Sequence, residues 1–166
     1  FVEIHTPKIM GSPSEGGAEL FTLEYFGQTA SLAQSPQFYK QMAMAAGLER
    51  VFEIGPAFRA DPSFTPRHAT EFTSVDMEMA WIDSHEDIMA FEETWLSHVL
   101  RTVKEKHGSE IKGTFGVEVV VPSLPFPKVT MEEAQTILQE KGYLPPAETK
   151  KGDIDPQGER LLCDYA

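Results

Sequence analysis

Two strand-forming segments on either side of a short polar loop constrain the fold of this chain most strongly. Residues 51–60 and 72–82 are rich in apolar and aromatic side chains, and the loop 61–71 between them contains two prolines. In the second segment, Val75 and Met77 alternate with Asp76 and Glu78, the period of a strand with two different faces. The pattern predicts an antiparallel pair of strands with polar residues at one end.

The remaining segments predict a mixed architecture. The expected elements are a strand at 1–4 broken by Pro7, strands 20–26 and 30–33 joined at Gly27-Gln28, helix 36–46 with Gly47 after it, a helix from Ser84 to Gly108, strand 115–121, a helix from Thr130 to about Lys141, and a final helix from Pro156. Small-residue and proline-rich loops are expected at 11–18 and 145–159. Runs of strands around a few helices, without strict alternation, favour an α+β fold with an antiparallel sheet.

Composition excludes several classes of protein. The 166 residues are enough for one globular domain, and no run of eighteen apolar residues predicts a membrane span. The chain opens without a basic segment followed by an apolar one, so we expect no secretion signal. A single cysteine, Cys163, excludes an internal disulfide framework and a zinc site built from several cysteines. The histidines show no metal-ligand spacing.

Positive charge is scarce. The chain carries 26 acidic and 14 basic side chains, a formal net charge of −12. On charge alone, nucleic acid is therefore disfavoured as a partner, although net charge does not say where the cations lie. The first hundred residues contain five lysines and arginines: Lys8, Lys40, Arg50, Arg59 and Arg67. If an anionic ligand binds in this half, nearly all candidate cations are in that set, with His68 as an auxiliary.

Two groups of polar residues have two interpretations each. Arg59, Arg67 and His68 flank the loop between the two strands, where they could converge on a polyphosphate with a nearby phenylalanine stacked on a base; they could equally be ordinary surface charges. Asp76 and Glu78 share one face of a strand. They could neutralise a cationic group of a ligand, or they could line a solvent-exposed edge.

The arginine-containing segment has a recognisable form. Phe58-Arg59-Ala60-Asp61, followed by Arg67-His68-Ala69-Thr70-Glu71-Phe72, closely resembles motif 2 of the class II aminoacyl-tRNA synthetases, and residues 1–9 resemble the strand end of motif 1 with Pro7 as its proline. Residues 14–18, 34–41 and 76–80 narrow the resemblance to the aspartyl-tRNA synthetases, in the archaeal and eukaryotic-like branch. The resemblance is strong over about residues 1–108 and loose beyond.

The resemblance implies a fold and a domain organisation. We expect a class II synthetase-like antiparallel sheet flanked by helices, incomplete because no motif 3 segment is present. Residues 1–166 would be a partial catalytic domain, with the end of motif 1 near 1–9, motif 2 near 51–82 and an insertion-like region at about 109–166. Such a fragment is not expected to form an aminoacyl-adenylate by itself.

It also implies roles for ten residues. For ATP these are Arg59, which would also be the catalytic residue at the α-phosphate, Arg67 and His68 at the γ-phosphate, Phe72 stacked on adenine, and Asp61 where the family usually has Glu. For the amino acid they are Lys40 at the side-chain carboxylate, Glu15, Gln37 and Asp76 around the α-ammonium group, and Glu78 in support. No metal ligand is expected within residues 1–166, so the ligands of Mg²⁺ would lie elsewhere.

The implied function is that of an aspartate–tRNA ligase, which activates aspartate with ATP and transfers it to the 3′ end of tRNA. Expected partners are aspartate, ATP, tRNA and a second copy in a homodimer, with a cytoplasmic location and no membrane. Three alternatives stay open: an asparaginyl-tRNA synthetase, an aspartate-activating paralogue resembling asparagine synthetase, and a non-catalytic paralogue. The cationic Lys40 suits a carboxylate better than a carboxamide, which favours aspartate.

Overall fold

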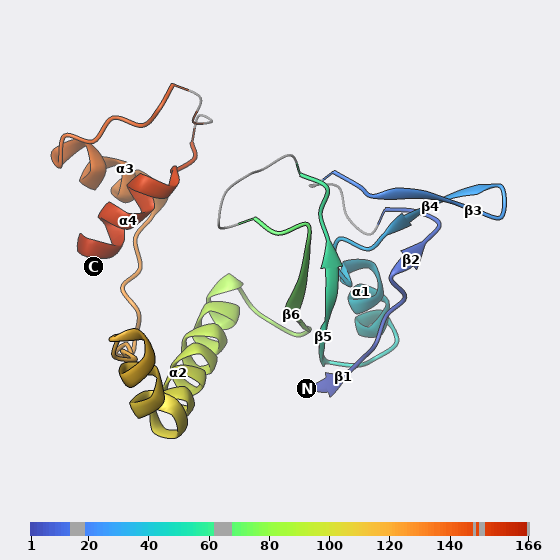
Figure 1. The fold of residues 1–166 in the computed structure, drawn as a ribbon, viewed down its shortest axis with the longest axis horizontal. Helices are drawn as coiled ribbons and strands as arrows, with labels where there is room; N and C mark the ends of the chain where they lie inside the picture. Colours follow the sequence, from blue (N-terminus) through green and yellow to red (C-terminus); the bar gives the residue numbers. More distant parts are fainter. Residues whose placement is uncertain (14–18, 62–67, 148, 150–151, 166) are drawn as a thin grey trace. The chain divides into compact units, whose positions relative to one another are not determined.

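The chain divides into two compact units, which we describe separately. The computed structural model describes residues 1–13, 19–61, 68–147, 149 and 152–165. The first unit spans Phe1–Ile88 and holds the strands and one helix; the second spans Met89–Ala166 and is helical (Figure 1). The prediction of an α+β fold is therefore confirmed.

The first unit contains two three-stranded sheets. One has the order β1 (Val2–Glu3), β5 (Arg50–Phe58), β6 (Glu71–Met79), and the other has the order β2 (Ile9–Met10), β4 (Gln28–Leu32), β3 (Thr22–Tyr25). The pair β5–β6 is antiparallel as predicted, and β1 joins β5 in parallel. The amide of Phe58 donates to the carbonyl of Ala33 at 3.0 Å, which connects the two sheets.

Helix α1 (Gln37–Ala45) lies beside β5 and β6 (Figure 1). It begins one residue later than predicted because Pro36 takes a non-helical conformation; the Ser35 hydroxyl accepts a hydrogen bond from the Gln37 amide at 3.2 Å. Gly47 ends it as predicted, with φ +92°. The amide of Leu48 returns to the carbonyl of Ala43 at 3.0 Å, as in glycine-terminated helices.

The β3–β4 hairpin turns one residue earlier than predicted. Tyr25 pairs with Gln28, so the two turn residues are Phe26 and Gly27 rather than Gly27 and Gln28. Their φ angles are 49° and 75°, which matches the positive values that a two-residue turn of the favoured type requires at both positions. Glycine takes the second of these positions, so the sequence signal was read in the wrong register.

The second unit contains helices α2 (His85–Phe115), α3 (Met131–Glu140) and α4 (Pro156–Tyr165), with α2 beginning in the first unit. The capping box of Thr130 and Glu133 at α3 is present, and α4 starts at Pro156 as predicted. Gly158 lies where α4 approaches α3: a Cβ placed there would be 3.3 Å from Leu138 Cδ1 and 2.9 Å from Ile154 Cγ2.

Two predictions in this region are wrong. Helix α2 continues through Gly108 to Phe115, because one glycine inside a long helix costs only about 1 kcal/mol and does not end it. It ends before Gly116, where φ is +68°. The predicted strand 115–121 is not formed: Val117 and Val120 are 59% and 74% exposed, and among the described residues no strand pairs with this segment.

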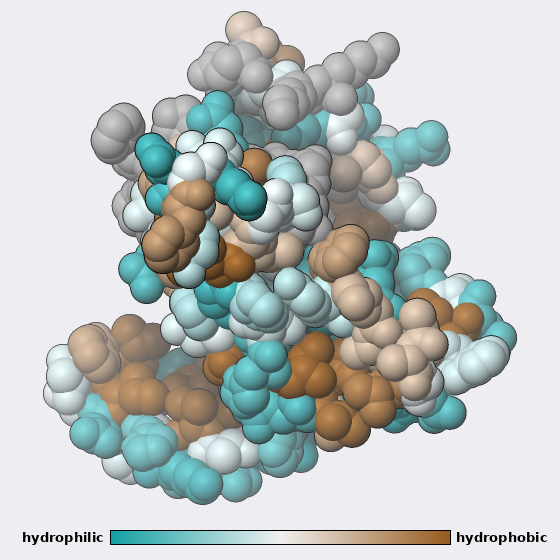
Figure 2. Space-filling model, turned by 90° about the vertical axis from the view of Figure 1, so that its right-hand side faces the viewer, coloured by the Kyte–Doolittle hydropathy of each residue, from teal (hydrophilic) through white to brown (hydrophobic). Residues whose placement is uncertain are grey.

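The core is small in both units. Buried hydrophobic residues are Met10, Ala30, Ala33, Val51 and Ala57 in the first unit, and Ala134 and Leu138 in the second. Hydrophobic side chains consequently remain at the surface between hydrophilic ones (Figure 2). Across the described ranges, no helix combines the length and the apolar composition needed to cross a lipid bilayer.

Candidate active site

A buried lysine lies at the centre of the candidate site. Lys40 is on α1 and its side chain is 5% exposed. Its ammonium group is hydrogen-bonded to the Asp76 carboxylate, lies 3.2 Å from Glu78 Oε2, and donates to the carbonyl of Met77 at 3.1 Å. The charges of Lys40, Asp76 and Glu78 sum to −1, so an isolated buried cation is avoided.

The face of the sheet that carries these carboxylates is the one covered by α1. Asp76 and Glu78 side chains are only 19% and 27% exposed. Val75, on the opposite face of the same strand, is 48% exposed, and its register partner Ile54 is 50% exposed. Asp76 and Glu78 therefore lie on a covered face of β6 and not on a solvent-exposed one.

The residues predicted to bind ATP lie at the other end of the same strands. Arg59 follows the last residue of β5, and its amide donates to the Thr70 carbonyl at 3.0 Å. Its guanidinium carbon lies 5.5 Å from the centre of the Phe72 ring, a cation–π arrangement. Phe72, Asp76 and Glu78 occupy alternate positions of β6 and share a face. Phe72 and Asp76 are about 13 Å apart along the strand at about 3.3 Å per residue.

The other predicted residues fall into two groups. Asp61 Oδ1 accepts a hydrogen bond from the Glu19 amide at 3.1 Å, Gln37 is the first residue of α1, and His68 is exposed beside the strand end. Glu15 and Arg67 lie outside the described residues, so their predicted roles stay predictions. The structure thus brings Arg59 to Phe72 and Lys40 to Asp76 and Glu78, on one face of one sheet.

A partly buried cluster that was not predicted from the sequence consists of Thr6, Lys8 and Glu53. The Lys8 ammonium donates to Glu53 Oε1 at 2.7 Å, and the Thr6 hydroxyl donates to Glu53 Oε2 at 2.6 Å. Burial alone would raise the pKa of Glu53, but the hydrogen bonds from Lys8 and Thr6 outweigh it and hold that pKa below its ordinary value. The sequence signal that could have predicted this cluster is the position of Glu53, which shares one face of the strand with Val51, Gly55 and Ala57.

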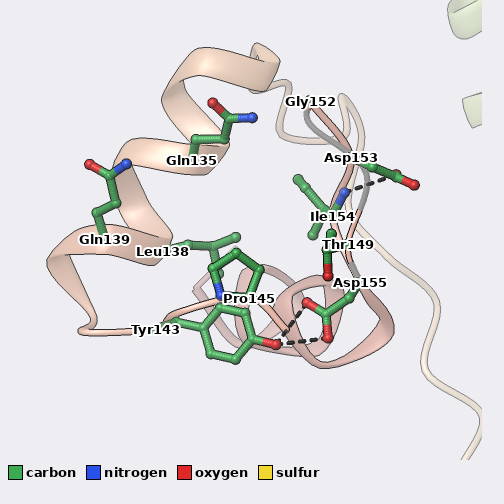
Figure 3. A pocket seen from close by; sticks show the side chains of 10 residues that line it. All are labelled: Gln135, Leu138, Gln139, Tyr143, Pro145, Thr149, Gly152, Asp153, Ile154 and Asp155. Atoms are coloured by element: carbon green, nitrogen blue, oxygen red, sulfur yellow. Dashed lines mark hydrogen bonds between the residues drawn. The ribbon is translucent and has the colours of Figure 1, made fainter. Parts of the chain in front are cut away.

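A pocket of about 190 Å³ lies in the second unit, far along the sequence from these residues. Its lining includes Gln135, Leu138 and Ile154, and the Tyr143 hydroxyl points at Asp155, at 2.7 Å from both carboxylate oxygens (Figure 3). The hydrogen bond from Tyr143 lowers the pKa of Asp155, whereas desolvation and this same carboxylate raise the pKa of Tyr143. No predicted site residue lines this pocket, and its Asp155 carboxylate accepts hydrogen bonds from the Gln157 and Gly158 amides at the start of α4.

The described side chains do not form a metal site. Within the described part of the chain, no three His, Cys, Asp or Glu side chains gather in a way that could hold a metal ion. The carboxylates of Asp76 and Glu78 in the candidate site are both paired with Lys40. These two residues do not fit Mg²⁺.

The family is decided by a match along the whole chain. The sequence model described as "tRNA synthetases class II (D, K and N)" matches residues 1–166. The chain belongs to this family. It is 47% identical over 166 residues to the aspartate–tRNA(Asp) ligase of Thermococcus kodakarensis, and 49% identical over 165 residues to the aspartate–tRNA(Asp/Asn) ligase of Methanopyrus kandleri. These alignments cover 99% and 98% of this chain but 37% of each relative, so this class II synthetase chain spans little more than a third of their length.

Solved structures agree with this assignment. The asparaginyl-tRNA synthetase of Pyrococcus horikoshii, complexed with asparaginyl-adenylate, superimposes with a TM-score of 0.86 at 36% identity, over 100% of this chain and 38% of that one. The aspartyl-tRNA synthetase of Entamoeba histolytica gives a TM-score of 0.75 at 31% identity, over 99% of this chain and 30% of that one. The expected class II synthetase-like fold is confirmed.

Proposed function

We propose that residues 1–166 are part of an aspartate–tRNA ligase. Such an enzyme joins the α-carboxylate of aspartate to the α-phosphate of ATP with release of pyrophosphate. It then transfers the aspartyl group to the terminal adenosine hydroxyl of tRNA with release of AMP. The observation that carries the proposal is the buried Lys40 of α1, held between the carboxylates of Asp76 and Glu78 on β6. The names and identities of the relatives support the same conclusion.

The Lys40 cluster is suited to a ligand that carries both charges. An aspartate molecule brings an ammonium group and a side-chain carboxylate, and the cluster already holds a cation against an anion. When aspartate binds, Lys40 would exchange Asp76 for the substrate carboxylate, and Asp76 would pair with the substrate ammonium group. Every buried charge would then still have a partner of opposite sign. Gln37 and Glu15 would complete the ammonium site, and Glu78 would stay beside Lys40.

Arg59 and its neighbours are assigned to ATP. A guanidinium group offers planar paired donors to phosphate oxygens and would stabilise the negative charge that develops as the carboxylate attacks the α-phosphorus. His68 and Arg67 would hold the γ-phosphate end, Phe72 would stack on adenine, and Asp61 would approach the base. The protein performs positioning and charge compensation rather than covalent chemistry.

The whole protein is proposed to act as a cytoplasmic homodimer with tRNA as its second substrate. Residues 1–9 and 51–82 then correspond to motifs 1 and 2 of a partial catalytic domain, and residues 109–166 to an insertion. The ligands of Mg²⁺ would come from outside this chain. Sedimentation of the full-length protein tests the dimer directly, because a single species of monomer mass contradicts it.

The decisive experiment is pyrophosphate exchange by the full-length protein with aspartate and with asparagine. Wild type is expected to prefer aspartate, and Lys40→Ala is expected to lose about 100-fold in kcat/KM for aspartate together with the preference. Lys112→Ala is the matched control, because Lys112 is 63% exposed and paired with Glu118 at the surface. An unchanged preference in Lys40→Ala contradicts the assignment.

A second candidate function is asparagine activation. It is supported by the likeness to the asparaginyl-tRNA synthetase of Pyrococcus horikoshii, which was solved with asparaginyl-adenylate. A carboxamide would accept from Lys40 but would bring no charge to it, so Lys40 would keep both carboxylate partners. Exchange that depends on asparagine and not on aspartate, in the wild-type protein, would favour this candidate over the first.

A further inference from the structure

Two carboxylates face each other across the β5–β6 ladder beneath α1. Glu53 on β5 and Asp76 on β6 are register partners, so both side chains project from the same face of the sheet. Directly opposite residues on an antiparallel pair have Cβ atoms about 5 Å apart, and like charges in these positions repel. With Glu53 only 3% exposed, water does little to screen this repulsion.

Each of these carboxylates has its own lysine. Lys8 bonds to Glu53 at 2.7 Å, with the side chains 20% and 4% exposed, and Lys40 bonds to Asp76. Thr6 fills the remaining positions on Glu53: its amide donates to Oε1 at 3.1 Å and its hydroxyl to Oε2 at 2.6 Å. The Lys8 ammonium also donates to Thr6 Oγ1 at 3.0 Å, which closes the cluster.

The Lys8–Glu53 pair affects which carboxylates are left to interact with Lys40. If Glu53 lost Lys8, its buried charge would draw on Lys40, which is already bonded to the residue opposite Glu53. If Lys8 lost Glu53, a second ammonium would face Asp76 and compete with any cationic group of a ligand. Either loss disturbs the amino-acid end of the site and leaves Arg59 and Phe72 unchanged.

We propose that Lys8 and Glu53 are positioning residues for the amino-acid site, which neutralise each other so that the Lys40–Asp76 pair stays available for exchange with the charges of the substrate. This inference rests on the proposed function, because it assigns Lys40 and Asp76 to the amino acid. We assign neither Lys8 nor Glu53 a contact with the substrate, because their polar groups are bonded to each other and to Thr6. Their effect therefore falls on the binding of the amino acid and not on the binding of ATP.

The test is a double-mutant cycle in the full-length protein, read as KM for aspartate and, separately, KM for ATP in pyrophosphate exchange. Lys8→Met and Glu53→Gln are each expected to raise KM for aspartate by about tenfold with less than about twofold change in KM for ATP. The double variant Lys8→Met/Glu53→Gln is expected to return KM for aspartate to within about threefold of wild type, since neither unpaired charge remains. Lys112→Met is the surface control.

A packing role gives a different result. If the double variant is no better than the worse single variant, or if both KM values rise together, the pair is only structural and the proposal is wrong. Should Lys8→Met fail to fold, Lys8→Arg keeps the charge and is expected to retain KM for aspartate, whereas a tenfold rise in that variant contradicts the proposal.

If wild type activates asparagine instead, the proposed function fails, and the same cycle read on KM for asparagine still decides the role of the pair. Wild type that activates neither amino acid overturns both.

Discussion

The two units place the same chemistry in different surroundings. In the first unit, Lys40 is paired with Asp76 and Glu78 with only 5% of the lysine side chain exposed. In the second unit, the ion pair of Lys112 with Glu118 is 63% and 69% exposed. Exposed pairs contribute little to stability, and buried ones require every charge to be matched. The comparison teaches that substitutions of the buried, paired charges of the first unit should change activity, and that substitutions in the second unit should change only stability.

The largest effect that we expect is a difference in activity between substitutions of two arginines at opposite ends of β5. Arg59 lies 5.5 Å from the Phe72 ring and Arg50 lies 6.0 Å from the Phe1 ring, so both stack on an aromatic side chain. Arg59→Ala is expected to lower kcat for pyrophosphate exchange by about 1,000-fold, as for loss of a donor to a developing charge. Arg50→Ala should change it by less than about threefold. Equal losses in both variants would show that stacking, and not phosphate binding, is the shared role.

The next effect tests the apolar contacts of the second unit. Leu138 is 7% exposed between α3 and α4, and Leu138→Ala is expected to destabilise that pair of helices by about 2–4 kcal/mol through cavity formation. Hydrogen exchange of the α3 amides in the full-length protein measures it. Leu144→Ala, at a side chain that is 85% exposed, should cost less than about 0.5 kcal/mol. A change in KM for aspartate in Leu138→Ala would break the separation between the units.

A smaller effect concerns the first turn of α3. The Thr130 hydroxyl accepts from the Glu133 amide at 3.2 Å, so Thr130→Ala is expected to weaken α3 by about 1 kcal/mol. Thr136→Ala is the matched control, because the Thr136 hydroxyl only donates to the Glu132 carbonyl within the helix. Amide exchange over residues 131–134 compares the two variants, and equal protection in both would mean that the cap is not formed in solution.

The smallest effect is a pH dependence of α4. The hydrogen bonds from Tyr143, Gly158 and Gln157 lower the pKa of Asp155 below its ordinary value of 3.8. Because the folded-state pKa is the lower one, the stabilisation is complete above the unfolded-state pKa and is lost as the pH falls through the folded-state value, below about pH 4. Amide exchange of Gln157 and Gly158 should accelerate in that range. Asp155→Asn should remove the dependence, whereas Asp153→Asn should keep it.

The sequence predicted local features better than paired ones. The signals that start and end a helix depend only on neighbouring residues, so Gly47, Thr130 and Pro156 marked helix ends correctly. Strand formation depends on a partner, and residues 115–121 failed for that reason despite their valines. The length of α2 was missed because a single glycine weakens a helix without ending it.

The same distinction applies to the candidate site. Motif spacing selected Lys40, Asp76 and Glu78, and the structure brings them together. That Lys40 bonds directly to Asp76 follows from the packing of α1 on β6, and that Lys8 bonds to Glu53 follows from the path of residues 4–8 beside β5. Neither contact has a sequence signal, since the partners are 36 and 45 residues apart.

The parallel pairing of β1 with β5 has a consequence for the order in which the protein assembles. Val2 lies opposite Val51, so this pairing joins residues almost fifty positions apart, whereas β5 and β6 are separated by a single loop. Loop-closure entropy delays contacts between distant residues, so the β5–β6 pair forms first and β1 is added to it. In the order β1-β5-β6, β1 therefore pairs with a strand that already has β6 on its other side, so the sheet is completed by the addition of a strand and not by the closure of a hairpin.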